Sequence, residues 1–180
     1  MNFAWARPAL VAVSAAALLA TAACNRQPAA SGVDLAKNAE EAAAFMKANA
    51  SAEGVQTLPS GLQYKVVASG PAGGVRPDRN DLARVDYEGS LTDGTVFDSS
   101  FKRGSPAVFS PEQVVPGWTE ALQLMKPGDE WLLYVPPELG YGEAGGPPMI
   151  PGNAVLVFRL KLLDVAPVPG GGRGVGSADV

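Results

Sequence analysis

The chain has 180 residues, of which 14 are Lys or Arg and 18 are Asp or Glu, so its formal net charge is −4. This length allows one ordinary domain with additional segments. No basic stripe runs through the sequence, which argues against nucleic acid as a partner, because a phosphate backbone must be neutralised by clustered Lys and Arg.

The whole sequence lacks histidine, and this narrows its chemistry further. Ser-His-Asp and Cys-His arrangements are impossible without the commonest general base. Cys24 is the one cysteine, so no zinc site and no intramolecular disulfide are expected. We therefore expect a function that needs neither a metal nor a cofactor.

The first 23 residues have the layout of a secretory signal, with a single positive charge at Arg7 and an apolar run over 9–20. The stretch LLATAAC, which ends at Cys24, resembles the lipobox of bacterial lipoproteins, although Thr21 replaces the usual Leu. Acylation of Cys24 would anchor the protein on the periplasmic side of a bacterial envelope. The alternative is ordinary cleavage, which would leave a soluble periplasmic protein with a free thiol. We favour the anchor, because a lone exposed thiol is a liability in an oxidising compartment.

A flexible linker is expected over residues 24–33, which are small and polar, and a helix over 34–52. The helix is rich in strong helix formers and presents Leu35, Ala39, Ala42 and Met46 on one face. That thin apolar stripe could pack on the following domain or pair with a second copy of the chain. Packing on the domain is slightly favoured.

Alternating apolar and polar residues predict strands over 62–66, 85–91 and 156–162. The nearly continuous apolar run 130–136 predicts a fourth strand, and the turn at 92–94 leads into a short fifth. Strands with one wet face favour an antiparallel sheet.

One helix interrupts these strands, beginning at Pro116 and ending before Pro127. It carries Trp118, Ala121, Leu122 and Met125 on a single face, so the sheet must curl around it. The sequence predicts an α+β domain over 53–166, with Trp118 between helix and sheet. The Gly-rich tail, 167–180, is expected to be disordered.

Three local patterns have chemical interpretations. Ser99 to Lys102 matches the S-x-x-K nucleophile motif, but it follows a strand and lacks the companion motifs, so the match is attributed to chance. Asp86 and Glu88 share the polar face of a strand and are expected to be a solvated pair. Asp98 follows Phe97 in an apolar strand and would need donors, which Arg103 and Tyr141 could supply.

Residues 136–153, PPELGYGEAGGPPMIPGN, form a long segment in which ten of eighteen positions are Gly or Pro. Long loops without secondary structure are uncommon in compact domains and are usually functional or disordered. Because this segment contains Tyr141 and Ile150, the question is whether it is a functional loop or a disordered one.

Three stretches, VDYEGSLTDGTVFDSSFKRGSPAVF, VVPGWTEALQLMKPGDEWLLYVPPELGYG and IPGNAVLVFRLKLLDV, resemble the FKBP-type peptidyl-prolyl cis-trans isomerases, including their bacterial envelope members. The resemblance runs almost continuously over 58–165. It implies a strongly twisted antiparallel half-barrel of about five strands around one short helix, with the long loop as the rim of a pocket. Gln113 departs from the family pattern, which often has a charged residue there, and so does the loop tip around Gly146.

The resemblance implies catalytic roles for Phe97, Asp98, Tyr141 and Phe158, and substrate binding by Tyr87, Arg103, Phe109, Val114, Val115, Trp118 and Ile150. It also implies activity on Xaa-Pro bonds of exported polypeptides and affinity for macrolides such as tacrolimus. Rotation of an amide makes and breaks no bond, so an apolar pocket that prefers the twisted amide suffices. A non-catalytic chaperone or docking module for Pro-containing segments is the alternative, and a structural lipoprotein with a solid core is a third interpretation.

Overall fold

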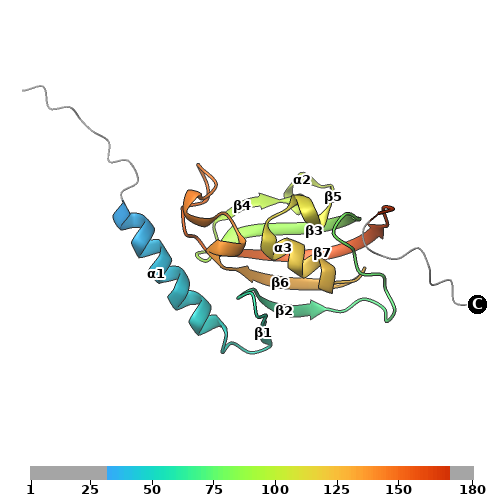
Figure 1. Ribbon diagram of the computed structural model, residues 1–180, viewed down its shortest axis with the longest axis horizontal. Helices are drawn as coiled ribbons and strands as arrows, with labels where there is room; N and C mark the ends of the chain where they lie inside the picture. The colour runs from blue at the N-terminus through green and yellow to red at the C-terminus, as the bar shows by residue number, and fades with distance from the viewer. Residues whose placement is uncertain (1–31, 171–180) are drawn as a thin grey trace, which may run out of the picture.

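A computed structural model of the chain describes residues 32–170. The expected signal segment 1–23, Cys24, most of the linker 24–33 and the tail beyond residue 170 lie outside the described residues. Within the described part, the α+β architecture expected from the sequence is confirmed: an N-terminal helix precedes one curled antiparallel sheet and a short helix (Figure 1).

Seven strands of the described region form this sheet, in the order β1-β2-β6-β7-β3-β4, with β5 also pairing with β3. Their bounds are β1 Val55–Thr57, β2 Gln63–Ala68, β3 Leu82–Leu91, β4 Val96–Ser99, β5 Ala107–Phe109, β6 Glu130–Val135 and β7 Leu156–Ala166. The five strands expected from the sequence are all present. β1 and β5 were not expected, because three residues are too few to show an alternating pattern.

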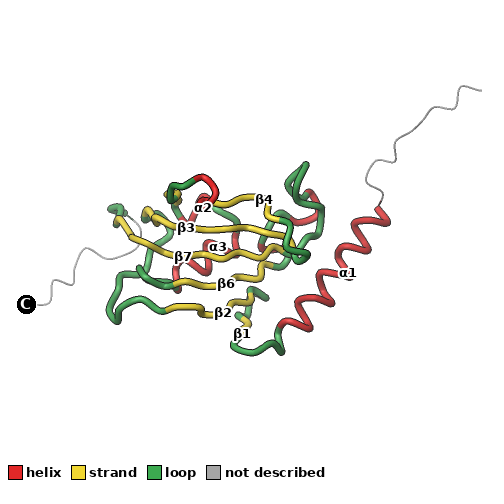
Figure 2. The backbone as a smooth tube through the Cα atoms, turned by 180° about the vertical axis from the view of Figure 1, so that it is seen from behind, coloured by secondary structure: helices red, strands yellow, loops and turns green. Residues whose placement is uncertain are grey.

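Helix α3, Pro116–Leu124, lies across one face of the sheet, in front of the strands in Figure 1 and behind them in Figure 2. Its predicted apolar face is confirmed, since Trp118, Ala121, Leu122 and Met125 are all buried. They pack with strand residues such as Val85, Leu133 and Leu160, which are fully buried. The single core therefore lies between α3 and the sheet that curls around it.

The N-terminal helix α1, Gly32–Asn49, packs against one end of the sheet (Figures 1 and 2). Ala42 is buried at this contact, and the ring of Phe45 lies 6.2 Å from that of Tyr134 on β6. Ala39 is exposed, so the contact face is rotated from the predicted stripe toward Asn38 and Phe45. The contact face differs from the predicted apolar face because polar contacts help to dock the helix, and a pattern of apolar residues does not reveal polar contacts.

The first residues of the predicted tail lie against the domain. Val168 donates its backbone N–H to the buried carboxylate of Asp81 at 2.9 Å. The same carboxylate accepts from the backbone N–H of Asp78 at 2.7 Å, so Asp81 ties the turn before β3 to the chain after β7.

Candidate active site

An open cleft of about 520 Å³ lies between α3 and the sheet. Its walls come from Tyr87, Phe97, Asp98, Phe109, Gln113, Val114, Val115, Trp118, Tyr141 and Phe158. This set contains every predicted pocket residue except Arg103 and Ile150, and it adds Gln113. The residues come from four strands, the helix α3, a short 3-10 helix and two loops, so only the folded chain brings them together.

The strand register places two of the three phenylalanines of the cleft, Phe97 and Phe158, side by side. On β3, Gly89 pairs with Asp98 of β4 on one side and with Phe158 of β7 on the other. A Cβ at Gly89 would lie 2.6 Å from the ring of Phe97 and 2.7 Å from the ring of Phe158. Glycine is therefore needed at this position for both rings to close over the strand.

Aromatic rings form a connected cluster around Trp118, which is 4% exposed. Its ring centroid lies 5.1 Å from Tyr87, 5.8 Å from Phe109 and 5.1 Å from Phe158, each in an edge-to-face arrangement. Phe97 continues the cluster through an edge-to-face contact with Phe158 at 5.7 Å. This is a favoured aromatic geometry, so the walls of the cleft hold one another in place.

The indole N–H of Trp118 is buried and has no hydrogen-bond partner among the described residues. An unpaired buried donor is costly, and such groups in native proteins call for an explanation. Here the donor belongs to the largest ring of an open apolar cleft. The protein thus shields this donor from solvent at the bottom of the cleft.

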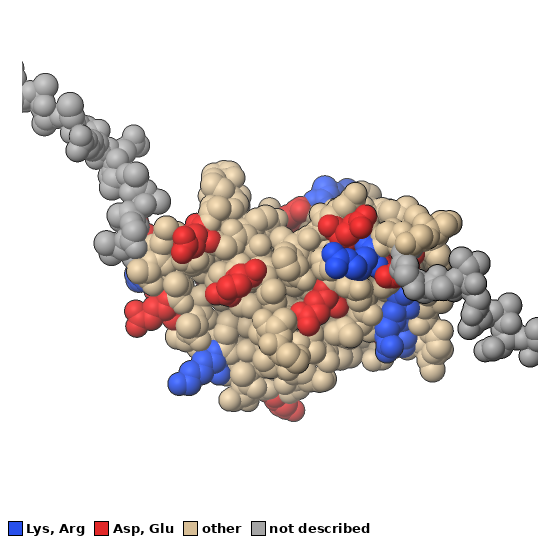
Figure 3. Space-filling view, viewed as in Figure 1, with Lys and Arg blue, Asp and Glu red and all other residues tan. Residues whose placement is uncertain are grey.

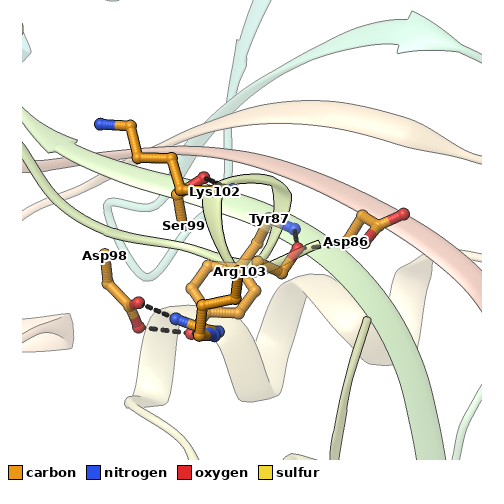
Figure 4. A network of polar contacts seen from close by, with 7 residues as sticks. Asp86, Tyr87, Asp98, Ser99, Lys102 and Arg103 are labelled. Carbon is orange, nitrogen blue, oxygen red and sulfur yellow. Dashed lines mark hydrogen bonds and ion pairs between the residues drawn. The ribbon is translucent and has the colours of Figure 1, made fainter. Parts of the chain in front are cut away.

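One edge of the cleft is polar and joins Tyr87, Asp98 and Arg103 (Figure 4). The Tyr87 hydroxyl donates to one carboxylate oxygen of Asp98, and Arg103 donates to the other. A second guanidinium nitrogen of Arg103 donates to the Tyr87 hydroxyl oxygen at 2.9 Å, and the guanidinium lies 5.4 Å from the Tyr87 ring centroid. The sequence pointed to Arg103 and Tyr141 as donors to Asp98; Arg103 is one, and Tyr87 is the other.

These contacts shift two ionisation equilibria in opposite directions. Partial burial acts to raise the pKa of Asp98, but hydrogen bonds from Tyr87 and Arg103, with the guanidinium charge, outweigh it and hold that pKa below its usual value. Burial, together with the hydrogen bond to the Asp98 carboxylate, raises the pKa of Tyr87. At neutral pH the polar edge therefore presents an ionised carboxylate and a neutral phenol.

A short helix, α2 (Ser100–Arg103), delivers Arg103 to this edge. Ser99 caps it by accepting from the backbone N–H of Lys102 at 3.3 Å, and Gly104 ends it in the left-handed conformation with φ 70°. Lys102 points away from the cluster in Figure 4. Ser99 thus has a structural role, in keeping with the S-x-x-K match being chance.

Asp86 is not simply a solvated acid, as the sequence suggested. Its carboxylate accepts from the fully buried Ser100 hydroxyl at 3.0 Å, and that hydroxyl oxygen accepts from the backbone N–H of Tyr87 at 2.9 Å. Asp86 therefore fixes α2 against β3. The sequence could not reveal this, because the two partners are separated by the β3–β4 turn.

The long Gly- and Pro-rich segment is ordered and forms part of the cleft. It contains two 3-10 helices, η2 Pro137–Leu139 and η3 Gly142–Ala144, and a bridge in which Gly146 and Ile150 exchange backbone hydrogen bonds of 2.9 Å. We call residues 141–153 the rim loop. Tyr141, 45% exposed, lines the cleft, whereas Ile150 is 8% exposed and belongs to the core behind it.

The segment before α3 supplies the other rim. Val115 is the residue before the helix, and its carbonyl oxygen accepts from the backbone N–H groups of Trp118 and Thr119 at 2.9 and 3.1 Å. Gln113 ends the short helix η1, Pro111–Gln113, and sequence reasoning noted it as a departure from the family pattern but not as a site residue.

Other features of residues 32–170 bear on the site's surroundings. They contain no group of three or more His, Cys, Asp or Glu side chains placed to hold a metal ion, and no helix with the length and apolarity to cross a membrane. The face that carries α3 is mostly uncharged, with scattered acidic side chains and a group of adjacent acidic and basic side chains toward the right of the view (Figure 3).

Two family models match the chain. The model described as FKBP-type peptidyl-prolyl cis-trans isomerase covers residues 73–163, and the model of the domain amino-terminal to such isomerases covers residues 8–66. The amino-terminal model thus includes β1 and most of β2 of the sheet as well as α1, and the isomerase model begins after them.

Curated proteins and a solved structure resemble the chain over about three quarters of its length. It is 52% identical to peptidyl-prolyl cis-trans isomerase Mip of Coxiella burnetii, over 71% of this chain and 55% of that protein. It is 48% identical to outer membrane protein MIP of Legionella longbeachae, over 72% and 54% respectively. The crystal structure of FkpA from Escherichia coli matches with a TM-score of 0.71 and 43% identity, over 77% of this chain and 63% of that one. The chain thus spans about half the length of the curated relatives it matches.

Proposed function

The chain belongs to the family of FKBP-type peptidyl-prolyl cis-trans isomerases, and from this premise we propose that its aromatic cleft catalyses cis-trans isomerisation of Xaa-Pro bonds in exported polypeptides. The observation that carries the proposal is the ring cluster around Trp118, whose packed apolar rings line an open cleft. A pocket of this kind holds a proline ring without needing an acid, a base or a metal.

The physical task is to lower a rotational barrier. Partial double-bond character in the C–N bond gives a barrier of about 18–20 kcal/mol, and Xaa-Pro bonds interconvert unaided in tens to hundreds of seconds. The twisted amide has a longer C–N bond and a less polar carbonyl, so it loses less hydration than the planar form on entering an apolar site. A desolvated cleft therefore binds the transition state in preference to the ground state.

Each wall of the cleft has a part in this proposal. Phe97, Trp118 and Phe158 enclose the proline ring. The backbone N–H of Val115 and the Tyr141 hydroxyl bond the substrate backbone on opposite rims. Asp98, ionised and held by Arg103 and Tyr87, faces the carbonyl carbon as it rotates.

Two substitutions separate the apolar walls from the carboxylate. If desolvation dominates, Phe158→Ala should lower kcat/KM in a protease-coupled assay on an Xaa-Pro tetrapeptide by more than about 10-fold, a loss of at least roughly 1.4 kcal/mol of transition-state binding. Asp98→Val should cost less than that. Phe158→Leu is the companion variant that keeps most of the core volume and therefore the fold. The reverse order of effects, or a wild-type protein without activity, would reject the assignment.

A non-catalytic chaperone or docking module for Pro-containing segments stays as the second candidate, and the exposure of Tyr141 at the rim is the observation that favours it. The two are separated by comparing a tetrapeptide with an unfolded proline-limited protein. An isomerase accelerates both, whereas a docking module slows the aggregation of the unfolded protein and leaves the tetrapeptide rate unchanged.

We further propose that the protein works in the bacterial envelope, anchored on the periplasmic side through an acylated Cys24. The LLATAAC stretch and the naming of one relative as an outer membrane protein support this. Mass spectrometry of the mature amino terminus tests it: a mature chain that begins at any other residue, or an unmodified Cys24, rejects the anchor. The open apolar cleft also supports binding of macrolides such as tacrolimus, which should compete with the tetrapeptide.

A further inference from the structure

We infer that Asn38 and Asn153 are positioning residues for the cleft, through which helix α1 holds the rim loop in the conformation that places Tyr141 at the cleft wall. The kinetic part of this inference rests on the proposed isomerase function. Its structural part does not, because it concerns contacts between α1 and the loop.

The two asparagines form a reciprocal joint. The side-chain amide of Asn38, on α1, donates to the carbonyl oxygen of Gly152 in the rim loop at 2.9 Å. The side-chain amide of Asn153, in the rim loop, donates to the carbonyl oxygen of Leu35 on α1 at 3.0 Å. Each element therefore supplies a donor to the backbone of the other, across more than a hundred residues of sequence.

Close packing supports the joint. A Cβ at Gly152 would lie 2.5 Å from the Leu35 side chain of α1 and 2.2 Å from the carbonyl oxygen of Glu143 in η3. No space separates the helix, Gly152 and the first turn of the rim loop. Because packed interfaces do not deform continuously, a displacement of α1 must disturb the loop.

Asn153 also closes the rim loop on itself. Its backbone N–H donates to the carbonyl oxygen of Gly142 at 2.8 Å, next to Tyr141. Its φ of 59° is a left-handed conformation in which Asn is one of the few tolerated residues other than Gly. One residue thus links the base of Tyr141 to helix α1.

Neither asparagine lines the aromatic cleft. Both border a separate hollow of about 280 Å³ between α1 and the domain. Any effect of these residues on substrate is therefore indirect, and the rim loop is the element that both contacts them and lines the cleft.

The other end of α1 provides a matched control. Asn49 donates its side-chain amide to Gln63 on β2 at 2.8 Å, and Gln63 donates to the carbonyl oxygen of Met46 at 2.7 Å. Asn49→Ala and Asn38→Ala each remove one side-chain hydrogen bond between α1 and the domain. Only Asn38 has its partner in the rim loop.

The experiment uses the full chain and two readouts. Hydrogen-deuterium exchange without substrate should show the amides of 141–153 exchanging roughly 3- to 10-fold faster in Asn38→Ala, as expected for loss of one hydrogen bond. KM for an Xaa-Pro tetrapeptide should rise about 2- to 5-fold with kcat nearly unchanged, because the binding-competent loop is less populated. Asn49→Ala should leave both values at the wild-type level.

Asn153→Gly is the second test. Glycine keeps the left-handed backbone and the N–H that closes the loop, so only the side-chain bond to α1 is lost. This variant should reproduce the effects of Asn38→Ala. The double variant should add less than the sum of the single effects, because both substitutions break the same joint.

The outcomes distinguish this inference from the proposed function. Faster loop exchange with weaker tetrapeptide binding supports the inference even if the protein has no turnover. The absence of turnover would reject only the proposed function. Unchanged loop exchange in Asn38→Ala and Asn153→Gly overturns the inference. Faster loop exchange with unchanged tetrapeptide affinity overturns it as well and leaves the isomerase standing.

Discussion

Among the described residues, Asp98 and Asp129 each combine a lowered pKa with a cation partner, and they differ in exposure. At the cleft, the Asp98 and Arg103 side chains are 43% and 47% exposed. At the turn between α3 and β6, the side chain of Asp129 is 5% exposed and that of Lys126 is 19% exposed. The same pairing chemistry therefore occurs once at the mouth of the cleft and once inside the scaffold.

The buried aspartate has its accepting capacity largely filled by the fold. One carboxylate oxygen of Asp129 accepts from the Lys126 ammonium at 2.6 Å and from the backbone N–H of Gly70 at 2.7 Å, and the other accepts from the backbone N–H of Lys126 at 3.0 Å. Asp98 accepts from two side chains and keeps an open face toward the cleft. The two acids share the direction of their pKa shift, so exposure, more than a shifted pKa, distinguishes the acid at the cleft from the buried one.

The largest expected effect comes from the buried cluster. Asp129→Ala should lower the free energy of unfolding by about 2–4 kcal/mol, because it leaves the Gly70 N–H and the Lys126 ammonium without their shared acceptor. Urea unfolding at pH 7 measures this. kcat/KM of the remaining folded protein should stay within twofold of the wild-type value. A loss of activity without a loss of stability would reverse the roles assigned to the two aspartates.

Much of the sheet and of the cleft could be predicted from the sequence. Alternation located the five longer strands, and the spacing of Trp118, Ala121, Leu122 and Met125 located the buried face of α3. The three-residue strands β1 and β5 carry too little pattern to be recognised. These two segments form strands because they pair with β2 and β3, and such pairing depends on distant parts of the chain and not on local sequence.

The polar contacts of the site were less predictable. Asp98 was recognised as an acid in need of donors, but choosing between Tyr87 and Tyr141 requires the β3–β4 register that places Gly89 opposite Asp98. Ile150 was expected at the ligand; it is 8% exposed and packs in the same buried cluster as Trp118 and Phe158, and its contact with a ligand stays a prediction. Asn38 and Asn153 gave no signal, since an asparagine on a polar helix face and one in a loop are both ordinary in sequence.

A decrease in pH is expected to have an intermediate effect on the free energy of unfolding. The pKa values of Asp98 and Asp129 are both lowered in the folded protein, for each by donors and a nearby cation that outweigh partial burial. A lowered pKa means that the stabilisation is fully present above the unfolded pKa of about 3.9 and is lost as pH falls through and below that value. Urea unfolding between pH 7 and pH 3 should therefore show stability that is flat above about pH 5 and declines below it.

Substitution of each aspartate by asparagine, which has the same shape without the charge, shows how much Asp98 and Asp129 each contribute to the loss of stability at low pH. Asp129→Asn should flatten the decline more than Asp98→Asn, because the buried carboxylate is screened less by solvent. Equal flattening, or none, would mean that exposure does not separate the two clusters. Over the same pH range above 5, kcat/KM should not change, because Asp98 stays ionised and Tyr87 stays neutral.

The smallest effect on stability is expected at the cleft. Asp98→Val should change the free energy of unfolding by less than about 1 kcal/mol, since exposed ion pairs are screened by water and cost side-chain entropy to form. The measurement is again the urea midpoint at pH 7. Arg103→Met removes the cation and serves as the matched variant, and the double variant shows whether the pair is coupled.

A change near zero in the free energy of unfolding of Asp98→Val would be informative, because stability would then not explain why a carboxylate lies in an apolar cleft. The carboxylate lines a largely aromatic cleft, and its two donors, Tyr87 and Arg103, could bond to water instead. If Asp98 contributes nothing to the stability of the fold, its role is to interact with the ligand that binds in the cleft. If Asp98→Val instead destabilises the protein as much as Asp129→Ala, the polar edge is scaffold, and catalysis must be credited to the aromatic walls alone.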